Sequence, residues 1–250
     1  MPSVAPALGS ATVVAQQWSE VAFLHWRVSP DRVAPLLPPR TEPDVLDGSS
    51  WVGLIAFRLS GSAFFGGPAI PWFGTFPEIN VRLYSIDDLR RRGVVFASLE
   101  ASRLASVATA RAAFGLPYHW ANMQMGRRGD TLAFTSRRHR LDRLFGNKRN
   151  PDAHLATRTR LTVRQTAERV DDPTSHFLTA RWAFHEKHLG AVRYARNEHA
   201  PWELYRAELV NLDDQLLAAA GFPDLAGRAP DSVLYSPGVR TRFGAPERLR

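Results

Sequence analysis

The chain has 250 residues, of which 32 are Lys or Arg and 24 are Asp or Glu, and it contains no Cys. This length is sufficient for one large domain or two small ones, with about 70–75% of the unfolded surface buried. The absence of Cys excludes a disulfide scaffold, a thiol nucleophile and every zinc or iron–sulfur site with Cys ligands. The basic residues comprise 30 Arg and only two Lys, Lys148 and Lys187.

No repeat, low-complexity segment or long linker divides the sequence. This predicts a single domain over residues 18–242, between a flexible N-terminal tail (1–17) and a C-terminal tail (243–250). The apolar runs are far shorter than the roughly 20 residues of a membrane-spanning helix, and the first 17 residues lack the basic start of a secretory signal. We therefore expect a cytoplasmic protein that does not enter a membrane; whether it forms a homo-oligomer stays open.

Short runs of β-branched and aromatic residues, separated by turn residues, predict many strands. They cover residues 21–28, 51–59, 78–84, 94–100, 118–125, 131–138, 157–165, 177–184, 191–196, 205–211 and 233–235. Helices are predicted after Ser29-Pro30, over the alanine-rich run 102–114, and over 213–220. Many strands and few helices predict a mainly β (α+β) fold, in which an antiparallel sheet is curled or closed and carries two or three helices.

The segment 61–77 combines Gly and Pro with five aromatic residues. It is either a loop folded over the core or a lid or wall of an apolar pocket, because such pockets are lined mainly by apolar and aromatic side chains.

Residues 78–84 alternate strictly between polar and apolar side chains. As a strand, this run places Glu78, Asn80 and Arg82 on one face. That face is either solvated, as is usual for an antiparallel strand, or turned into a ligand cavity. In a cavity, the Arg82 guanidinium would hold a neighbouring carboxylate ionised, or it would bind and orient a carboxylate or carbonyl group of a substrate.

The helix expected at 102–114 ends at Gly115 and Pro117, directly before Tyr118 and His119. The end of the helix explains Gly115 and Pro117, and Tyr118 and His119 would be ordinary residues at the start of a strand. In a functional interpretation, the stop places Tyr118 and His119 at the sheet end, where both could exchange protons with a ligand.

Other chemistry is not expected from the sequence. Phosphate-loop, dinucleotide, nucleophile-elbow and HExxH motifs are missing. The run His185-Glu186-Lys187-His188 contains possible metal ligands. In a strand, however, His185 and His188 are three residues apart and point to opposite faces, so no metal or cofactor is predicted. The basic cluster between Arg137 and Arg149 lacks the interleaved aromatic residues that stack on bases, so a nucleic-acid partner is not expected.

Ordered motifs along the chain carry a resemblance to a known family. They are Trp26 in FLHWRV, LLPPR, Asp47-Gly48 before Trp51-Val52-Gly53-Leu54, the run from Phe76 to Tyr84, Ala110-Arg111, Leu116-Pro117-Tyr118, Leu178 to Trp182, His199-Ala200-Pro201-Trp202 and Tyr235-Ser236-Pro237-Gly238. Over about residues 18–242 the chain resembles the YqjF-like proteins, uncharacterised domains of unknown function that are similar to acetoacetate decarboxylase in fold. The resemblance implies a β-cone or barrel of antiparallel strands around an internal cavity.

The resemblance also bears on chemistry. Acetoacetate decarboxylases carry a Gly-x-Pro-Lys-Lys element, whose first Lys forms a Schiff base with a β-keto acid, and a supporting strand Glu. In this chain Tyr118 stands in place of the first Lys and His119 in place of the second, and Glu78 matches the strand Glu. A phenol cannot form an imine, so a genuine acetoacetate decarboxylase is not expected.

We therefore predict a cavity for a small oxo- or carboxyl-bearing organic molecule. If the protein is an enzyme, we expect lyase- or isomerase-like acid–base chemistry, such as enolisation, hydration or dehydration. The predicted roles are Glu78 as base or orienting carboxylate, Tyr118 as acid or oxyanion donor, His119 in its support, and Asn80, Arg82 and Arg111 as substrate binders. The alternative is a non-catalytic small-molecule binding or sensing protein. His199 and Trp202 are predicted to fix a turn, with a role at the cavity left open.

Overall fold

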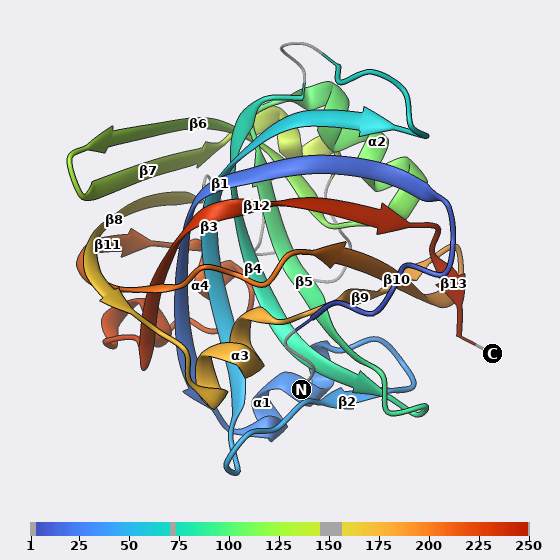
Figure 1. The fold of residues 1–250 in the computed structure, drawn as a ribbon, viewed down its shortest axis with the longest axis horizontal. Coiled ribbons are helices and arrows are strands. Elements are labelled where there is room, and N and C mark those ends of the chain that lie inside the picture. The colour runs from blue at the N-terminus through green and yellow to red at the C-terminus, as the bar shows by residue number, and fades with distance from the viewer. Residues whose placement is uncertain (1–3, 71–73, 146–156, 250) are drawn as a thin grey trace.

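The computed structural model describes residues 4–70, 74–145 and 157–249, which are mainly β (Figure 1). The strands are β1 (Thr12–Val28), β2 (Thr41–Pro43), β3 (Ser50–Phe64), β4 (Phe76–Asp87), β5 (Arg92–Ala101), β6 (Tyr118–Arg128), β7 (Thr131–Arg138), β8 (Arg158–Arg169), β9 (Ala183–His188), β10 (Ala191–His199), β11 (Tyr205–Asp214), β12 (Ser232–Gly244) and β13 (Glu247–Arg248). The helices are α1 (Pro30–Val33), α2 (Leu104–Phe114), α3 (Pro173–Thr179) and α4 (Leu216–Ala219), with 3-10 turns at Ala34–Leu36, Arg140–Phe145 and Leu225–Gly227.

All the strands belong to one sheet, in the order β13-β10-β9-β5-β6-β7-β8-β11-β12-β1-β3-β4-β2. Additional pairings of β10 with β12 and of β5 with β4 join strands that are distant in this order. As a result, β12, β1, β3, β4, β5, β9 and β10 form a closed ring. The pairings are antiparallel apart from β5–β6 and β5–β9. The predicted mainly antiparallel, barrel-like sheet with few helices is confirmed.

The alternation of β4 divides its side chains between two environments. Ile79, Val81 and Leu83 belong to the main hydrophobic core on the outer side of the ring. Glu78 and Arg82 lie on the opposite face and are also buried. Because both faces are covered, the polar row points into the interior of the ring rather than into solvent.

One predicted strand is wrong. Residues 173–179 form helix α3, where a strand over 177–184 was predicted, and β9 begins only at Ala183. The helix starts at Asp172, whose Oδ1 accepts a hydrogen bond from the backbone N–H of Ser175 at 2.9 Å, and Pro173 follows at the first position. This local capping outweighs the β-preference of the apolar residues that follow.

Strands extend into both predicted tails. β1 begins at Thr12 and pairs with β12 from that residue onward. β12 runs through Gly244, and β13 pairs with β10. The pairing of β12 with β10, which closes the ring, therefore includes Phe243 of the predicted C-terminal tail.

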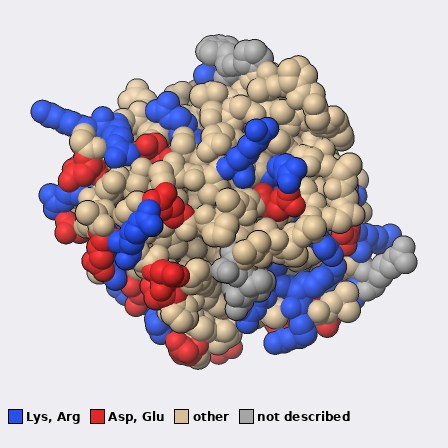
Figure 2. Space-filling model, viewed as in Figure 1, with Lys and Arg blue, Asp and Glu red and all other residues tan. Residues whose placement is uncertain are grey.

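Charged side chains of both signs are interspersed over much of the face in Figure 2. Within the basic cluster, Arg137 and Arg140 are exposed, but Arg138 is buried and pairs with Glu100 at 2.6 Å. Lys148 and Arg149 lie outside the described residues. In the described parts of the chain, no helix is long and apolar enough to cross a membrane.

Candidate functional site

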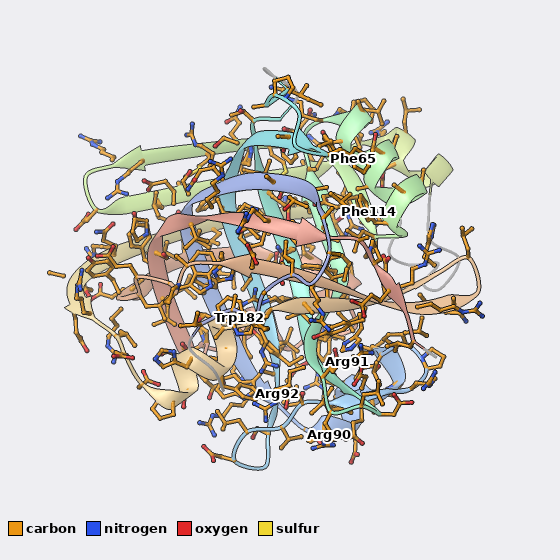
Figure 3. The ribbon with its side chains drawn as sticks, turned by 45° about the vertical axis from the view of Figure 1, so that its right-hand side comes forward. Phe65, Arg90, Arg91, Arg92, Phe114 and Trp182 are labelled. Atoms are coloured by element: carbon orange, nitrogen blue, oxygen red, sulfur yellow. The ribbon has the colours of Figure 1, made fainter. Side chains whose placement is uncertain are left out.

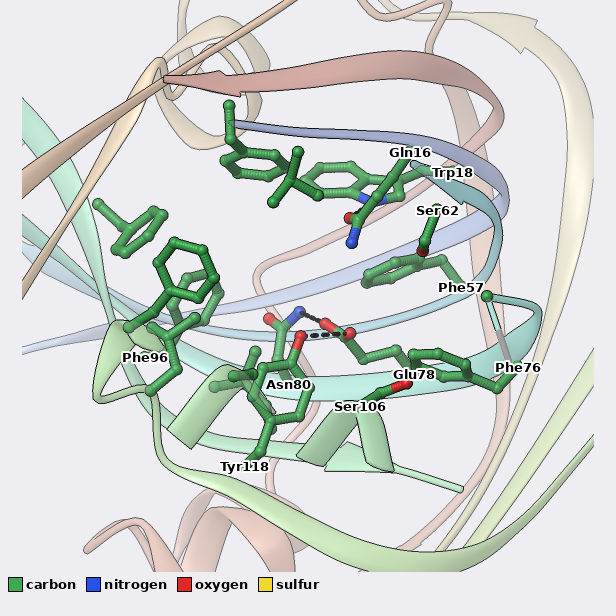
Figure 4. Close-up of a pocket in the computed structure, with 18 of the residues that line it drawn as sticks. Gln16, Trp18, Phe57, Ser62, Phe76, Glu78, Asn80, Phe96, Ser106 and Tyr118 are labelled. Atoms are coloured by element: carbon green, nitrogen blue, oxygen red, sulfur yellow. Dashed lines mark hydrogen bonds between the residues drawn. The ribbon is translucent and has the colours of Figure 1, made fainter. Parts of the chain in front are cut away.

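A cavity of about 520 Å³ lies within the ring, lined by side chains of β1, β3, β4, β5, β9, β10 and β12 and by α2 (Figure 4). In Figure 3, Phe114 of α2, which lines the cavity, lies in the upper part of the molecule, whereas Arg90 and Arg91 of the β4–β5 turn and Arg92 at the start of β5 lie in its lower part. Most of the lining is apolar, and its aromatic members include Trp18, Phe23, Phe57, Phe76, Phe96 and Trp202. The size and lining are those of a site for an organic ligand.

Three polar side chains meet in the wall of the cavity (Figure 4). The Tyr118 hydroxyl donates to Glu78 Oε2 at 2.8 Å, and Asn80 Nδ2 donates to Glu78 Oε1 at 3.4 Å. Asn80 Oδ1 is buried and accepts no hydrogen bond within the described residues. β4 supplies Glu78 and Asn80 from alternate positions, and the start of β6 supplies Tyr118. The sequence-predicted residues Glu78, Asn80 and Tyr118 are therefore brought together.

The burial of this group changes its acidity. Burial raises the pKa of Glu78 to about 7, although the hydrogen bonds from Tyr118 and Asn80 act in the opposite direction. Burial and the adjacent Glu78 carboxylate both raise the pKa of the Tyr118 phenol well above its usual value. Near neutral pH, Glu78 is thus divided between its acid and base forms while Tyr118 keeps its proton, which suits proton transfer.

The raised pKa of Glu78 predicts a stability effect. The folded protein holds this proton more tightly than the unfolded chain, so the free energy of unfolding falls as pH rises from 4.5 to above 7. For a shift from 4.5 to about 7, the loss is roughly 3 kcal/mol. We expect Glu78→Gln to remove this pH-dependent loss. In urea titrations at increasing pH, the free energy of unfolding of the variant should therefore rise relative to that of the wild type. Parallel curves for the two proteins would contradict this expectation.

Arg82 also lines the cavity. Its Nη2 donates to the Leu178 carbonyl at 2.9 Å and its Nε to the Tyr84 hydroxyl at 3.2 Å. Among the described residues, none of the ion pairs includes Arg82. The cavity wall therefore holds a buried guanidinium whose described partners are neutral. The expectation that the guanidinium would hold the neighbouring carboxylate ionised is therefore wrong, because burial instead raises the pKa of Glu78.

Arg111 and His119 do not line the cavity, although both were predicted as site residues. Arg111 Nε donates to the backbone carbonyl of Tyr118 at 2.5 Å. His119 Nδ1 lies 2.5 Å from Asp142 Oδ2, and Asp142 Oδ1 accepts from the backbone N–H of Trp120 at 3.0 Å. These contacts fix the first residues of β6, and with them the position of Tyr118.

Trp202 lines the cavity, and its indole N–H donates to the Thr179 carbonyl at 3.0 Å. His199 is packed against the rings of Trp182 and Trp202, at centroid distances of 4.6 and 4.9 Å, and its Nδ1 bonds to the Ala200 carbonyl. Burial lowers the pKa of His199 to about 4. His199 thus lies behind the cavity wall, whereas Trp202 forms part of it.

His185 and Glu186 lie elsewhere in the fold. His185 Nδ1 is 2.8 Å from the Ser85 hydroxyl, and Glu186 is buried without a hydrogen-bond partner in the described structure. No group of three or more His, Asp or Glu side chains that could hold a metal was found among residues 4–70, 74–145 and 157–249.

The lysines do not reach the cavity within the described structure. Lys187 is exposed on β9, and the described lining contains no Lys. Lys148 lies outside the described residues. Tyr118 occupies the wall where the resemblance would place a Schiff-base lysine.

Several lining residues were not predicted. Val14, Gln16 and Trp18 face the cavity from β1, and Ser106 and Thr109 face it from α2. The segment 61–77, by contrast, was predicted as either a loop over the core or a lid or wall of an apolar pocket, and its Ser62, Phe64, Ile70, Gly74 and Phe76 line the cavity, whereas Trp72 and Phe73 lie outside the described residues. The alternation of residues 14, 16 and 18 is the signal that could have indicated the β1 face.

The chain is similar to several known proteins. The chain is 31% identical over 196 residues to "Uncharacterized protein YqjF" of Bacillus subtilis, which covers 78% of this chain and 76% of that protein. An acetoacetate decarboxylase-like enzyme from Sphingomonas wittichii has a similar structure, with a TM-score of 0.63, 15% identity, and coverage of 96% of this chain and 93% of that chain.

Two further solved structures share the fold. Acetoacetate decarboxylase from Legionella pneumophila matches with a TM-score of 0.63, 13% identity, and coverage of 100% of this chain and 92% of that chain. The enduracididine biosynthesis enzyme MppR complexed with pyruvate matches with a TM-score of 0.58, 14% identity, and coverage of 95% and 90%. The family model DUF2071, described as "Uncharacterized conserved protein (COG2071)", matches residues 15–240. The chain therefore belongs to this family of uncharacterised proteins and has the acetoacetate decarboxylase-like fold.

Proposed function

We propose that the protein binds a small oxo- or carboxyl-bearing organic molecule in the cavity and moves a proton on it without a covalent intermediate. The observation that carries the proposal is Glu78, a buried carboxyl with a pKa of about 7 and a 2.8 Å hydrogen bond from Tyr118, in the cavity wall. A base with this pKa is half ionised near neutral pH, which favours general acid–base catalysis. The pyruvate complex of the structural relative MppR also supports an oxo acid ligand.

The residues suggest one proton-transfer step. Ionised Glu78 removes a proton from the carbon beside a carbonyl; the C–H electron pair forms the C=C bond, and the carbonyl π electrons move onto oxygen. The Tyr118 hydroxyl can turn from Glu78 to donate to that oxygen, and Asn80 can present its amide N–H from the next position on β4. Arg111 and His119 act as positioning residues for Tyr118.

The test is a panel of oxo acids incubated with the protein in D₂O and followed by proton NMR. Enolisation exchanges the protons beside the carbonyl, whereas hydration or dehydration changes the product spectrum. Protein-dependent exchange that depends on Glu78 supports the proposal. If no acid that binds exchanges its protons faster than in buffer alone, the proposed proton transfer is rejected.

Tyr118→Phe is expected to lower turnover by roughly ten- to a thousand-fold, because it removes a donor to the developing oxyanion. The Tyr118 hydrogen bond lowers the pKa of Glu78, so its removal raises that pKa above about 7. The acidic limb of the pH–rate profile should therefore move to higher pH. Tyr194→Phe is the matched control, because Tyr194 is buried outside the cavity. An unchanged limb in Tyr118→Phe would contradict the assignment.

The second candidate is a non-catalytic binding or sensing protein, which the predominantly apolar lining favours. Mass spectrometry of the denatured protein would identify a copurified molecule. Retention of that molecule without turnover in the D₂O experiment would select this function.

A further inference from the structure

The spacing of polar groups along β4 carries an inference about the ligand. Glu78 and Arg82 face the same cavity from positions four residues apart on one strand, which separates their Cα atoms by about 13 Å. The Arg82 guanidinium extends beyond its own position to Tyr84, away from Glu78, as its 3.2 Å bond to the Tyr84 hydroxyl shows. The cationic and proton-transfer ends of the cavity are therefore well separated.

Arg82 is poorly compensated by the protein. It is only 9% exposed, and its described partners are a carbonyl and a phenol. The neighbouring Arg181 has its own acid, Asp44, which is buried beside it. Burial of a guanidinium beside neutral groups alone is costly, and an anionic group on the ligand would offset that cost. This assigns the carboxylate end of the ligand to Arg82.

Apart from Asn80, whose amide N–H is bonded to Glu78, the surface between the two ends is largely apolar. Phe23, Ile55 and Leu99 line the cavity from β1, β3 and β5, and Leu99 is the strand partner of Asn80, which lies between Glu78 and Arg82. The Arg82 guanidinium lies 5.6 Å from the Phe23 ring centroid. A ligand that reaches both ends must therefore place carbon, rather than polar groups, against most of this surface.

We propose that the ligand is an oxo acid whose carboxylate and reactive carbonyl are separated by an apolar spacer of about six bonds or more. The inference rests on the proposed function, since it assumes that the carbonyl lies at Glu78 and Tyr118. Because the Arg82 guanidinium reaches away from Glu78, the Cα separation of about 13 Å is a lower limit for the gap between the two ends. Allowing about 2.8 Å for a hydrogen bond at each end, the two ligand groups lie at least roughly 7–8 Å apart. The two groups of a β-oxo acid are joined through two bonds of about 1.5 Å each and cannot reach both ends at once.

The experiment compares affinities, by calorimetry, across oxo acids of increasing spacer: pyruvate, 4-oxopentanoate, 7-oxooctanoate and 9-oxodecanoate. We expect 7-oxooctanoate to bind at least ten-fold more tightly than pyruvate and 4-oxopentanoate. It should also bind at least ten-fold more tightly than 2-octanone, which has the same carbon chain without the carboxylate. Equal or tighter binding of the short acids, or equal binding of 2-octanone, would overturn the inference.

Variants of Arg82 test the same point independently of the length series. Arg82→Gln should abolish the preference for 7-oxooctanoate over 2-octanone, and Arg82→Lys should retain part of it; an unchanged preference in Arg82→Gln overturns the inference. If Arg82→Gln does not fold, the wild-type comparison decides. Glu78-dependent exchange on acids of every length, without length-dependent affinity, would retain the proposed function and reject this inference. Length-dependent binding without Glu78-dependent exchange would retain this inference about the ligand and reject the proposed proton transfer.

Discussion

Glu78→Gln is expected to lower turnover of a bound oxo acid by roughly 10²- to 10⁴-fold, while ligand affinity changes only a few-fold. Gln has the shape of Glu and still accepts a hydrogen bond from Tyr118, so the cavity keeps its form. It cannot remove a proton, because the amide oxygen is a very weak base. The measurement is the rate of deuterium exchange beside the carbonyl, with affinity measured on the same preparation.

Glu186→Gln is the matched control for this variant. Glu186 is also buried, and burial raises its pKa to about 7, as for Glu78. It does not line the cavity. The same chemical change at the same degree of burial should therefore leave turnover within about three-fold of wild type. Equal losses in the two variants would indicate a general effect on the fold, and no loss in Glu78→Gln would reject Glu78 as the base.

The parts of the site that follow local patterns were predictable from the sequence. Alternation placed Glu78, Asn80 and Arg82 on one face of β4. The helix stop at Gly115, which adopts φ +70°, placed Tyr118 at the start of β6. Sequence alone could not decide between a solvated and an enclosed polar face, because that depends on the closure of the ring by β5 and by β10 with β12.

β1 shows why other lining residues escaped prediction. Val14, Gln16 and Trp18 face the cavity from even positions, but Val21 and Phe23 face it from odd positions. The change occurs at Glu20, which has φ +55°, within an irregularity of the β1–β3 register. Such a bulge adds one residue and switches the inward face. A constant alternation along β1 cannot describe both halves.

Trp202 depends on contacts that no local pattern specifies. It follows β10 in a segment without regular structure and reaches the cavity through packing on Phe23 and a hydrogen bond to the Thr179 carbonyl of α3. α3 itself was predicted as part of a strand. A side chain held by a distant element can be placed only when that element is known.

Gly238→Ala is expected to lower the free energy of unfolding by about 3–5 kcal/mol, a large part of the roughly 5–15 kcal/mol of a typical domain. Gly238 has φ +125°, and an added Cβ would lie 1.9 Å from the backbone carbonyl oxygen of Trp18. Strain at such a backbone angle costs about 1–3 kcal/mol, and two paired strands must also move apart.

Gly126→Ala provides the control for Gly238→Ala, because Gly126 also lies within a strand and an added Cβ there would contact nothing within 4 Å. We expect that variant to stay within about 1 kcal/mol of wild type in urea unfolding. The cavity gives a second measurement. Because Gly238 holds β12 against β1 at Trp18, which lines the cavity, folded Gly238→Ala should also bind oxo acids more weakly than Gly126→Ala. Equal unfolding midpoints for the two variants would show that β1 and β12 can separate at this point without loss of unfolding free energy. Gly238 would then not be the residue that fixes the position of Trp18.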